Sequence, residues 1–451
     1  MDSPLKIAIY NLGCRVNAYE SFALADIARA RGLKVVPWGE KADFAVVNSC
    51  ALTVLAQAKT RQAIRIFARA NPDSPIAVTG CYAQIAPGEV GKISNVKIVA
   101  GNPSKSGVID MLLSAAGAGN AEKTEPATGE FSVSECGFID DRVNLKIQDG
   151  CDNCCSYCVI PRARGRPRSR GFGEILEDAK NLAARGAREI TLTGINITKF
   201  STPEGGLVEL VDALDEIGGL SRIRIGSIEP QDMPVDALLE RAADNSHKLQ
   251  PHFHVCAQSL CDRVLKAMRR KNTAAEFLEF VRKAKDKCAD ISIGADIICG
   301  HPFERDCDYL ETKEAVLSSG LSYAHVFTFS PRPKTLAATM GADTPPPRVR
   351  RMRSDDLRAA AAQMHERFMA SQLGKVRPIL FEKPIEGGRY LAYTDNYIRL
   401  EVCGASSGLK NTMAFARLES IIDSSRVLAS DRKSTRLNSS HPSRSRMPSS
   451  A

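Results

Sequence analysis

Short apolar runs alternate with amphipathic stretches along the first part of the chain. Four runs fall within residues 5–116 and read KIAIYN, DFAVVN, PIAVTG and VKIVAG. Between them lie segments such as AKTRQAIRIFARA, whose apolar residues recur at helical spacing. This alternation is typical of an α/β fold with an open parallel sheet. We therefore predict such a domain over residues 1–116, followed by a linker over residues 117–141, which are rich in Gly, Ala, Thr and Glu.

A second α/β series begins at residue 142. Its six apolar runs read VNLKIQ, ITLTG, RIRIGSIEP, HFHVCAQS, ISIGADIICG and YAHVFTFSP. Amphipathic segments such as FGEILEDAKNLAARG separate them. Six such units predict a partial (βα)6 barrel over residues 142–373, with its chemistry at the carboxyl ends of the strands.

Residues 374–428 follow a long charged helical segment and have a strand-like pattern. Polar and apolar residues alternate in RPILFEK, YIRLEVCG and MAFARLESI, as in a small antiparallel β-barrel. The predicted fold class is thus α/β: an open parallel α/β domain, a partial barrel and a small C-terminal β-barrel.

The last segment, residues 431–451, has almost no apolar residues. Its first part, DRKSTRLNSSH, resembles the in-frame translation of a sequencing adapter. We interpret the natural coding sequence as ending near Ser430 and assign no function to residues 431–451.

Composition and charge exclude some classes of function. No apolar run approaches the ~20 residues that span a bilayer, and the start, MDSPLKIAIYNLGC, lacks the features of a signal peptide. We therefore expect a cytoplasmic protein with no membrane partner. The net charge of +9 includes +4 from residues 431–451, so basicity by itself is weak evidence for nucleic acid binding. In a reducing compartment, clustered members of the 14 cysteines favour metal binding or redox chemistry over disulfides.

Three N-terminal cysteines share one position relative to the predicted strands. Cys14, Cys50 and Cys81 each directly follow an apolar run. Carboxyl ends of parallel strands line one crevice, so the three thiols are expected to meet there. This set suits an iron–sulfur cluster with one open iron, or zinc with an open position.

The stretch GCDNCCSYC, after the first predicted barrel strand, has two interpretations. Two C-x-x-C pairs would make a zinc knot, but adjacent Cys154 and Cys155 would then have to bind one ion although neighbouring side chains point apart. The alternative, C-x-x-x-C-x-x-C, uses Cys151, Cys155 and Cys158. Three thiolates hold three corners of a [4Fe–4S] cube and leave the fourth iron open, which is the arrangement that a radical S-adenosylmethionine (SAM) enzyme needs.

Residues 5–428 resemble the radical SAM methylthiotransferases. NLGCRVNAYES, VVNSCALT and VTGCYAQ resemble that family's cluster-binding domain, and GCDNCCSYCVIPRARGRPRSR resembles its radical SAM signature. IRIGSIEP, PHFHVCAQS, GADIICGHPFE and HVFTFSPRPKT resemble later barrel motifs, and YLAYTDNYIRLEV resembles the RNA-binding TRAM module. LGCRVNAYES with NSCALT is most similar to the branch that acts on threonylcarbamoyladenosine in tRNA, because the other branches have Gln-Met-Asn or Pro-Lys-Asn after the first cysteine.

The resemblance implies two [4Fe–4S] clusters, one on each cysteine trio, and SAM as both radical source and methyl donor. It implies methylthiolation of C2 of N6-threonylcarbamoyladenosine next to the anticodon. It also implies tRNA as a partner, an electron donor such as flavodoxin or ferredoxin, and a sulfur source. The alternatives are isopentenyladenosine in tRNA or a ribosomal protein as the target, or a non-catalytic, metal-dependent RNA-binding protein.

Further site residues are expected at the strand ends of the barrel and in the loop beside the second trio. Three histidines, His254, His301 and His325, are expected to be packed or hydrogen-bonded rather than to bind metal. Polar or glycine positions suited to SAM are Gly194, Ser227, Glu229, Gln258 and Asp296. Arginines suited to tRNA phosphates or to the substrate carboxylate are Arg162, Arg164, Arg166, Arg168 and Arg170.

The chain departs from the family pattern at several positions. Leu260, Lys334 and Ala392 replace usual glycines, Cys154 replaces a usual aromatic residue, and GHPFE replaces the more usual GFPGE. A side chain in place of glycine is expected to change how closely the backbone approaches a ligand.

Overall fold

The computed structural model describes residues 4–118, 142–340, 344–403 and 408–431. The chain forms two compact units, Met1–Phe368 and Met369–Ala451. The linker predicted for residues 117–141 lies outside the described residues except for its first two positions, which end a helix.

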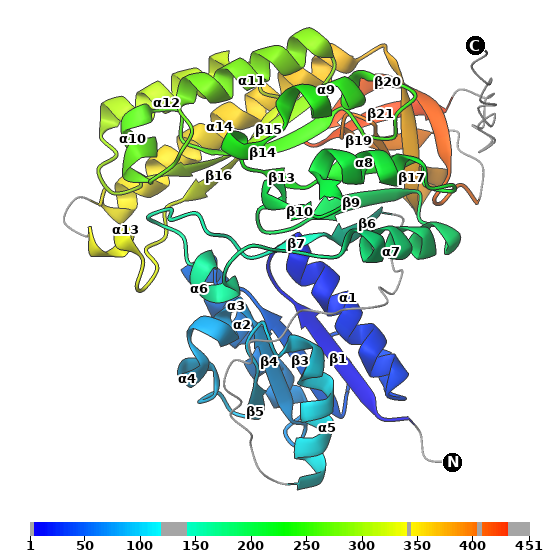
Figure 1. Cartoon of the computed structure of the whole chain (residues 1–451), viewed down its shortest axis with the longest axis vertical. Helices are drawn as coiled ribbons and strands as arrows, with labels where there is room; N and C mark the ends of the chain where they lie inside the picture. The colour runs from blue at the N-terminus through cyan, green and yellow to red at the C-terminus, as the bar shows by residue number, and fades with distance from the viewer. Residues whose placement is uncertain (1–3, 119–141, 341–343, 404–407, 432–451) are drawn as a thin grey trace. The chain divides into compact units, whose positions relative to one another are not determined.

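The N-terminal part of the first unit is built on a parallel five-stranded sheet (Figure 1). All four predicted runs are strands, and the short edge strand Lys34–Val36 is an addition to them. The strand order is β2-β1-β3-β4-β5. The strands are β1 (Lys6–Asn11), β2 (Lys34–Val36), β3 (Phe44–Ser49), β4 (Ile76–Gly80) and β5 (Val96–Val99).

Helices connect these strands and cover the sheet. Apolar side chains such as Ile64 and Phe67 pack on Val47 and Val78, and Thr53 caps α2 by accepting a hydrogen bond from the Ala56 amide at 3.0 Å. The helices are α1 (Arg15–Ala30), α2 (Val54–Ala70), α3 (Cys81–Ile85), α4 (Pro87–Val90) and α5 (Val108–Ala118).

The second part of the first unit is a curved wall of parallel strands with helices on its outer side, as the pattern predicts (Figure 1). Its strands pair in the order β6-β9-β12 and, after a break at Gly226, β13-β14-β15-β16. The strands are β6 (Arg142–Lys146), β9 (Glu189–Thr193), β12 (Arg222–Ile225), β13 (Ser227–Ile228), β14 (His252–Gln258), β15 (Ser292–Cys299) and β16 (Tyr323–Thr328). The main helices are α7 (Phe172–Ala184), α8 (Leu207–Asp215), α9 (Val235–Ala243), α11 (Ala274–Lys287), α12 (Asp306–Ser318) and α14 (Pro347–Gln372).

Side-chain alternation in β14 separates an apolar outer face from a polar inner one. Phe253 and Val255 belong to the core that Phe277 of α11 completes. Successive side chains of a strand point to opposite faces, so His252 and His254 face the concave side. The interior of this partial barrel is therefore polar, which suits a ligand site better than a packed core.

The second unit contains a closed five-stranded barrel, in the order β17-β18-β19-β21-β20. The prediction of an all-antiparallel barrel is wrong for one pair, because β19 and β21 are parallel. Ala392 is fully buried in β18 opposite Phe381 and Leu400. The strands are β17 (Val376–Ile385), β18 (Arg389–Thr394), β19 (Arg399–Cys403), β20 (Met413–Asp423) and β21 (Arg426–Asp431).

The last strand therefore ends one residue inside the segment interpreted as artefact, and residues 432–451 lie outside the described residues. Within the described ranges, no helix has the length and apolar character needed to cross a membrane.

Candidate functional site

The first cysteine trio lies at the carboxyl edge of the N-terminal sheet. Cys14 follows β1 as the N-cap of α1, Cys50 follows β3, and Cys81 follows β4 as the first residue of α3. Because β1, β3 and β4 are adjacent and parallel, the structure brings the three thiols to one edge, as predicted. Cys14 is exposed, Cys50 is half-buried and Cys81 is buried.

Two glycines allow this close approach. Gly13 has a φ of +125°, and a Cβ there would lie 3.1 Å from the Cβ of Cys50. Gly80 has a φ of +92°, and a Cβ there would lie 2.4 Å from the carbonyl oxygen of Ser49. A side chain at either position would push the loop of its neighbouring cysteine away from Cys50.

The second trio lies in the loop between β7 (Gln148–Asp149) and α6 (Ile160–Arg164). This loop is held near its start and in its middle. The Cys151 amide donates to the Gly165 carbonyl at 3.0 Å, and the Ser156 amide donates to the Met268 carbonyl at 3.0 Å. The Ser156 hydroxyl also lies 2.9 Å from Nε2 of His301, which confirms that His301 is hydrogen-bonded.

Hydrogen bonds to sulfur separate Cys154 from its neighbours. Cys154 is exposed, and its thiol donates to the Asp152 carbonyl at 3.7 Å. The other three sulfurs accept hydrogen bonds from N–H groups. Such bonds stabilise thiolates and change the reduction potential of a bound cluster. The donors are the Asn153 amide to Cys151 (3.4 Å), Arg270 Nη1 to Cys155 (3.8 Å) and the Ile160 amide to Cys158 (3.4 Å). This difference supports the C-x-x-x-C-x-x-C interpretation.

The first trio has similar donors. The Leu52 amide donates to the Cys50 sulfur at 3.4 Å, and Nδ2 of Asn102 donates to the Cys81 sulfur at 3.7 Å. Burial raises the pKa of the Cys50 thiol to about 11 and that of Cys158 to about 12. Such thiols are protonated at neutral pH, and a bound metal displaces their protons.

The sulfurs of each trio are spread more widely than the ligands of a compact single-ion site. Among the described residues, the groups whose three ligand atoms all lie within 4.8 Å are His254–Asp296–His325 and Cys261–Asp308–Glu311. Neither cysteine trio is that compact. Tetrahedral zinc with Zn–S of ~2.3 Å would hold its sulfurs ~3.8 Å apart, whereas a cube of four irons spreads them further. Three sulfur ligands in each trio suit a [4Fe–4S] cluster with one open iron.

Helix α6 connects the two trios. It begins two residues after Cys158 and packs against α3, whose first residue is Cys81 (Figure 1). Asn102 joins them, because its Nδ2 donates both to the Ala163 carbonyl at 2.7 Å and to the Cys81 sulfur. Displacement of α6 would therefore change the surroundings of both trios.

A buried network of charged side chains fixes α6 and α1 to the barrel. Glu20 of α1 accepts hydrogen bonds from Lys105, from Lys146 at 2.8 Å and from Arg164 at 2.9 Å. Asp149 pairs with Lys146 at 2.7 Å and with Arg164 at 3.0 Å. Burial would raise the pKa of Glu20, but the charges of Arg164, Lys105 and Lys146 outweigh burial and hold that pKa well below its usual value.

This network joins three buried cations to two carboxylates, and Asp149 also lies 3.8 Å from the more exposed Arg168. Burial lowers the pKa of Lys105, and the neighbouring charges of Glu20 and Cys81 oppose that effect. A negatively charged thiolate site beside the network would interact favourably with these cations.

The structure gives the predicted SAM residues different surroundings. Gly194 follows β9, and a Cβ there would lie 2.7 Å from Cγ2 of Ile197 and 3.1 Å from Cβ of Gln148. Gln148 joins that loop to the cysteine loop, since its Oε1 accepts from the Asn196 amide at 2.8 Å and its Nε2 donates to the Gly150 carbonyl at 2.8 Å. Gly194 thus permits packing at the base of the cysteine loop.

Glu229 lies beside the second trio. Its carboxylate accepts a hydrogen bond from Arg270, whose guanidinium also donates to the Cys256 carbonyl at 2.7 Å and to the sulfur of Cys155. Ser227 is exposed in β13. Gln258 ends β14 at a register shift with a φ of 67°, which turns its side chain out of the strand alternation.

The prediction of a strand-end position is wrong for Asp296, which lies in the middle of β15. Its carboxylate accepts a hydrogen bond from Nε2 of His254 at 2.9 Å and lies 3.5 Å from Nδ1 of His325. On its other nitrogen, His254 contacts the Tyr323 hydroxyl at 3.1 Å. The hydrogen-bonded state predicted for His254 is confirmed. Asp296 contacts both His254 and His325 inside the barrel.

The arginine run divides into two groups. Arg164 has no exposed side-chain surface and is paired with Glu20 and Asp149, so it holds the fold instead of facing tRNA. Arg170 is mostly buried and pairs with Asp178 at 2.9 Å. The exposed members, which remain suited to phosphates or carboxylates, are Arg162, Arg166 and Arg168.

Sequence reasoning missed Arg270, Asn102 and the partners of Glu20. The sequence held one sign of this network. Asn17 and Glu20 lie three residues apart, so both polar side chains fall on one face of the helix that follows Cys14. Asn17 Oδ1 indeed accepts from Arg164 at 2.6 Å.

Two departures from the family pattern retain a glycine-like backbone. Phe303 of GHPFE and Lys334 have φ values of 67° and 65°, in the left-handed region that favours glycine. Leu260 instead has no such φ among the described residues and packs in the barrel core. The loops of Phe303 and Lys334 thus keep the glycine conformation although their side chains are larger.

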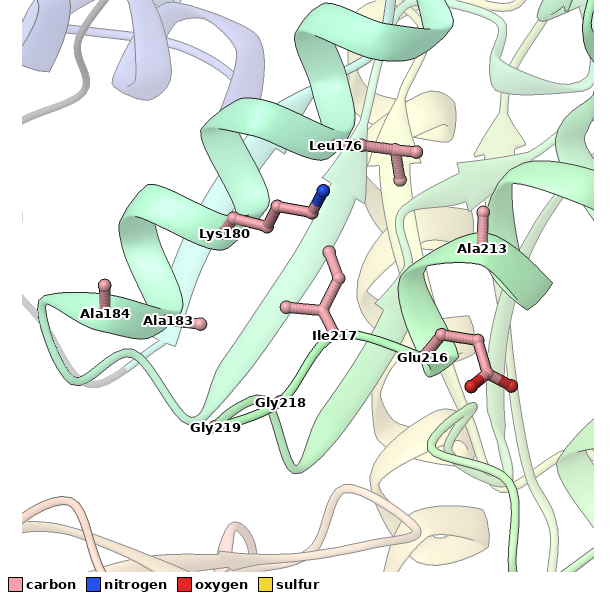
Figure 2. Close-up of a pocket in the computed structure, with 9 residues that line it drawn as sticks. All are labelled: Leu176, Lys180, Ala183, Ala184, Ala213, Glu216, Ile217, Gly218 and Gly219. Carbon is pink, nitrogen blue, oxygen red and sulfur yellow. The ribbon is translucent and has the colours of Figure 1, made fainter. Parts of the chain in front are cut away.

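A surface hollow of about 580 Å³ lies away from this site, between α7 and the segment after α8 (Figure 2). Leu176, Lys180 and Ile217 point toward it, and no cysteine or predicted site residue lines it.

Comparisons with known proteins agree with this geometry. Residues 6–101 match the model described as "Uncharacterized protein family UPF0004", and residues 145–316 match that of the radical SAM superfamily. The radical SAM methyltransferase TsrM from Kitasatospora setae has a similar fold, with a TM-score of 0.53 and 14% identity over 72% of this chain and 75% of TsrM.

Curated relatives extend the similarity over most of the chain. The threonylcarbamoyladenosine tRNA methylthiotransferase MtaB of Thermotoga maritima is 34% identical, covering 89% of this chain and 92% of that protein. MtaB of Bacillus subtilis is 33% identical, covering 87% and 89%. The tRNA-2-methylthio-N(6)-dimethylallyladenosine synthase of Novosphingobium aromaticivorans is 34% identical, covering 84% and 87%.

The identity of 33–34% extends over nearly the whole of both chains. The cysteine trios agree with it, since the first lies at strand ends and the second in the loop after β7. The chain belongs to the radical S-adenosylmethionine methylthiotransferase family.

Proposed function

We propose that this enzyme attaches a methylthio group to C2 of N6-threonylcarbamoyladenosine next to the anticodon of tRNA. The observation that carries the proposal is the pair of cysteine trios connected through α6 within one compact unit. The relatives with this named activity match over 87–91% of the chain.

Cys151, Cys155 and Cys158 hold one [4Fe–4S] cluster, and Cys14, Cys50 and Cys81 hold the other. When bound, these groups supply the electron that cleaves SAM and the sulfur that is transferred. Glu229, which Arg270 links to Cys155, orients SAM together with Ser227 at the start of β13 and Gln258 at the end of β14. Arg270 pairs with Glu229 and donates to the Cys155 sulfur, so it joins the SAM-binding side of the pocket to the cluster.

Arg15 favours the threonylcarbamoyl substrate over the isopentenyl one. It follows Cys14 directly, is exposed, and has no hydrogen-bond or ion-pair partner among the described residues. A Cβ at Gly226, where β12 ends, would lie 3.9 Å from its Nη1, so the guanidinium reaches the carboxyl edge of the barrel. The threonyl group carries a carboxylate that an arginine fork binds well, whereas the isopentenyl group carries no charge.

The remaining partners are those that the proposed chemistry requires. The enzyme acts in the cytoplasm, receives electrons from a flavodoxin or ferredoxin, and draws on a separate sulfur source. The C-terminal barrel binds tRNA as a TRAM module.

Nucleoside analysis tests the substrate. A strain lacking its own threonylcarbamoyladenosine methylthiotransferase is complemented with this gene, and its tRNA nucleosides are separated by mass. We expect 2-methylthio-threonylcarbamoyladenosine to return, and a Cys155→Ala variant to restore none. Return of 2-methylthio-isopentenyladenosine in the corresponding strain, or of a methylthiolated ribosomal protein, would instead assign one of the alternative substrates.

Anaerobic reconstitution with iron and sulfide tests the cofactors independently. We expect two clusters per chain, with absorbance near 400 nm. A chain that binds zinc alone would instead be a non-catalytic RNA-binding protein.

A further inference from the structure

Arg332 is a buried arginine without partners. It lies in the loop after β16, is only 2% exposed, and none of its three guanidinium nitrogens has a hydrogen-bond partner in the part of the chain that the structure describes. Arg164, which is similarly buried in the same unit, is instead paired with Glu20 and Asp149.

A buried cation without a counter-charge is strongly disfavoured. Burial lowers the pKa of Arg332, although a guanidinium stays protonated in proteins. Its five N–H donors therefore need acceptors that the protein side chains do not supply. An anionic ligand or cofactor with several acceptor atoms would meet this need.

The surroundings of Arg332 indicate which anion this is. The ionisable groups that act on it electrostatically are Cys50, then Tyr82 and Glu89. Tyr82 and Glu89 already bond to each other at 2.9 Å, and Arg61 donates to the Tyr82 hydroxyl at 2.9 Å. The loop itself contacts the segment after Cys50, because the Val54 amide donates to Ser330 Oγ at 3.4 Å. Neither Tyr82 nor Glu89 accepts a hydrogen bond from Arg332 in the described residues. Cys50, which acts most strongly on Arg332 and whose following segment contacts the Arg332 loop, is the site where an anionic group would supply the missing acceptors.

We propose that Arg332 is a positioning residue of the N-terminal cluster, with its guanidinium donating hydrogen bonds to sulfur atoms of the group that Cys50 holds. This inference rests on the proposed occupancy of Cys14, Cys50 and Cys81 by a [4Fe–4S] cluster. Three thiolates and the cluster sulfides carry net negative charge and many acceptor positions, which match an arginine fork. A residue of the barrel thereby completes a site built on the N-terminal sheet.

The charge of Arg332 has two consequences. Arg332 destabilises the cluster-free protein, where it is unpaired, and stabilises the loaded protein, where it is paired. It also favours the more negative, reduced state of the cluster and so raises its reduction potential.

The test measures thermal unfolding of Arg332→Met in the metal-stripped chain and in the reconstituted enzyme. We expect the substitution to raise the melting temperature of the stripped chain and to lower that of the loaded one. Arg164→Met is the matched control, because its protein partners are present in both states and its melting temperature should fall in both. Equal shifts for Arg332→Met in both states would overturn the proposal.

Redox titration gives the second readout. A background chain with Cys151, Cys155 and Cys158 changed to Ala retains only the N-terminal cluster. In this background chain, Arg332→Met should make the reduction potential of the cluster more negative, and Arg332→Lys should give a value between those of the background chain and of Arg332→Met. An unchanged potential at full iron content would overturn the inference while leaving the proposed function intact. If the background chain binds no iron and sulfide at all, the proposed function and the inference both fail.

Discussion

At the scale of single residues, neighbouring cysteines differ in what surrounds their sulfur atoms. Cys155 is half-buried and accepts a hydrogen bond from Arg270, whereas Cys154 is exposed and donates to a backbone carbonyl. A hydrogen bond donated to sulfur stabilises a metal-bound thiolate, and of this pair Cys155 accepts such a bond among the described residues.

Serine substitutions distinguish the two cysteines. Cys154→Ser should leave iron and sulfide content unchanged, because this sulfur is directed to Asp152. Cys155→Ser should remove the equivalent of one cluster, measured as iron per chain and as absorbance near 400 nm. Loss of a cluster in Cys154→Ser would restore the interpretation with two C-x-x-C pairs.

Arg15 provides a test of substrate recognition. A hydrogen bond to a charged group contributes about 1.5–3 kcal/mol, so Arg15→Gln should lower kcat/KM for a threonylcarbamoyladenosine stem–loop about 10- to 100-fold. Cluster content and SAM cleavage without substrate should stay unchanged.

The control for this prediction is a stem–loop whose threonyl carboxylate is esterified. It lacks the charge that Arg15 would bind, so the wild type and the variant should use it equally well. If Arg15→Gln lowers activity on both stem–loops by the same factor, Arg15 does not recognise the carboxylate.

At the scale of elements, a buried set of ion pairs determines how α1 and α6 meet the barrel. Glu20 has 1% side-chain exposure and binds three cations, so its loss would leave them without a counter-charge. The pair between Arg31 and Asp110 also joins two elements of the N-terminal part but faces solvent.

Glu20→Gln should destabilise the protein by about 3–5 kcal/mol, the usual cost of breaking a buried ion pair from one side. Chemical denaturation of the stripped chain measures this loss. Arg31→Gln should leave the unfolding midpoint unchanged, because exposed pairs contribute little. A Glu20→Gln chain as stable as the wild type would show that the network is not needed to hold α6.

At the scale of the whole molecule, the predicted cluster ligands and the closed barrel belong to different compact units. All six predicted cluster cysteines lie in Met1–Phe368, and the closed barrel lies in Met369–Ala451. Cluster assembly and SAM cleavage are therefore expected to depend on the first unit, and tRNA affinity on the second.

A chain ending at residue 374 should still reconstitute two clusters and form 5′-deoxyadenosine from SAM under reducing conditions. Its KM for tRNA should rise about tenfold or more, since each basic contact to phosphate that is lost weakens binding. Filter binding at several salt concentrations measures the change, and the salt dependence should become shallower. Unchanged tRNA affinity would remove the RNA-binding role from the barrel.

The sequence by itself determined the succession of strands, the positions of the six cysteines relative to those strands, and the family. These features depend on local periodicity and on motifs of adjacent residues, which the chain displays directly. Tertiary structure alone decided that Arg164 is buried, that Asp296 lies within a strand, and that the loop of Arg332 contacts the segment after Cys50. Each of these features depends on contacts between side chains that are distant in sequence. A run of alternating arginines has the same sequence pattern whether one of them faces solvent or two buried carboxylates.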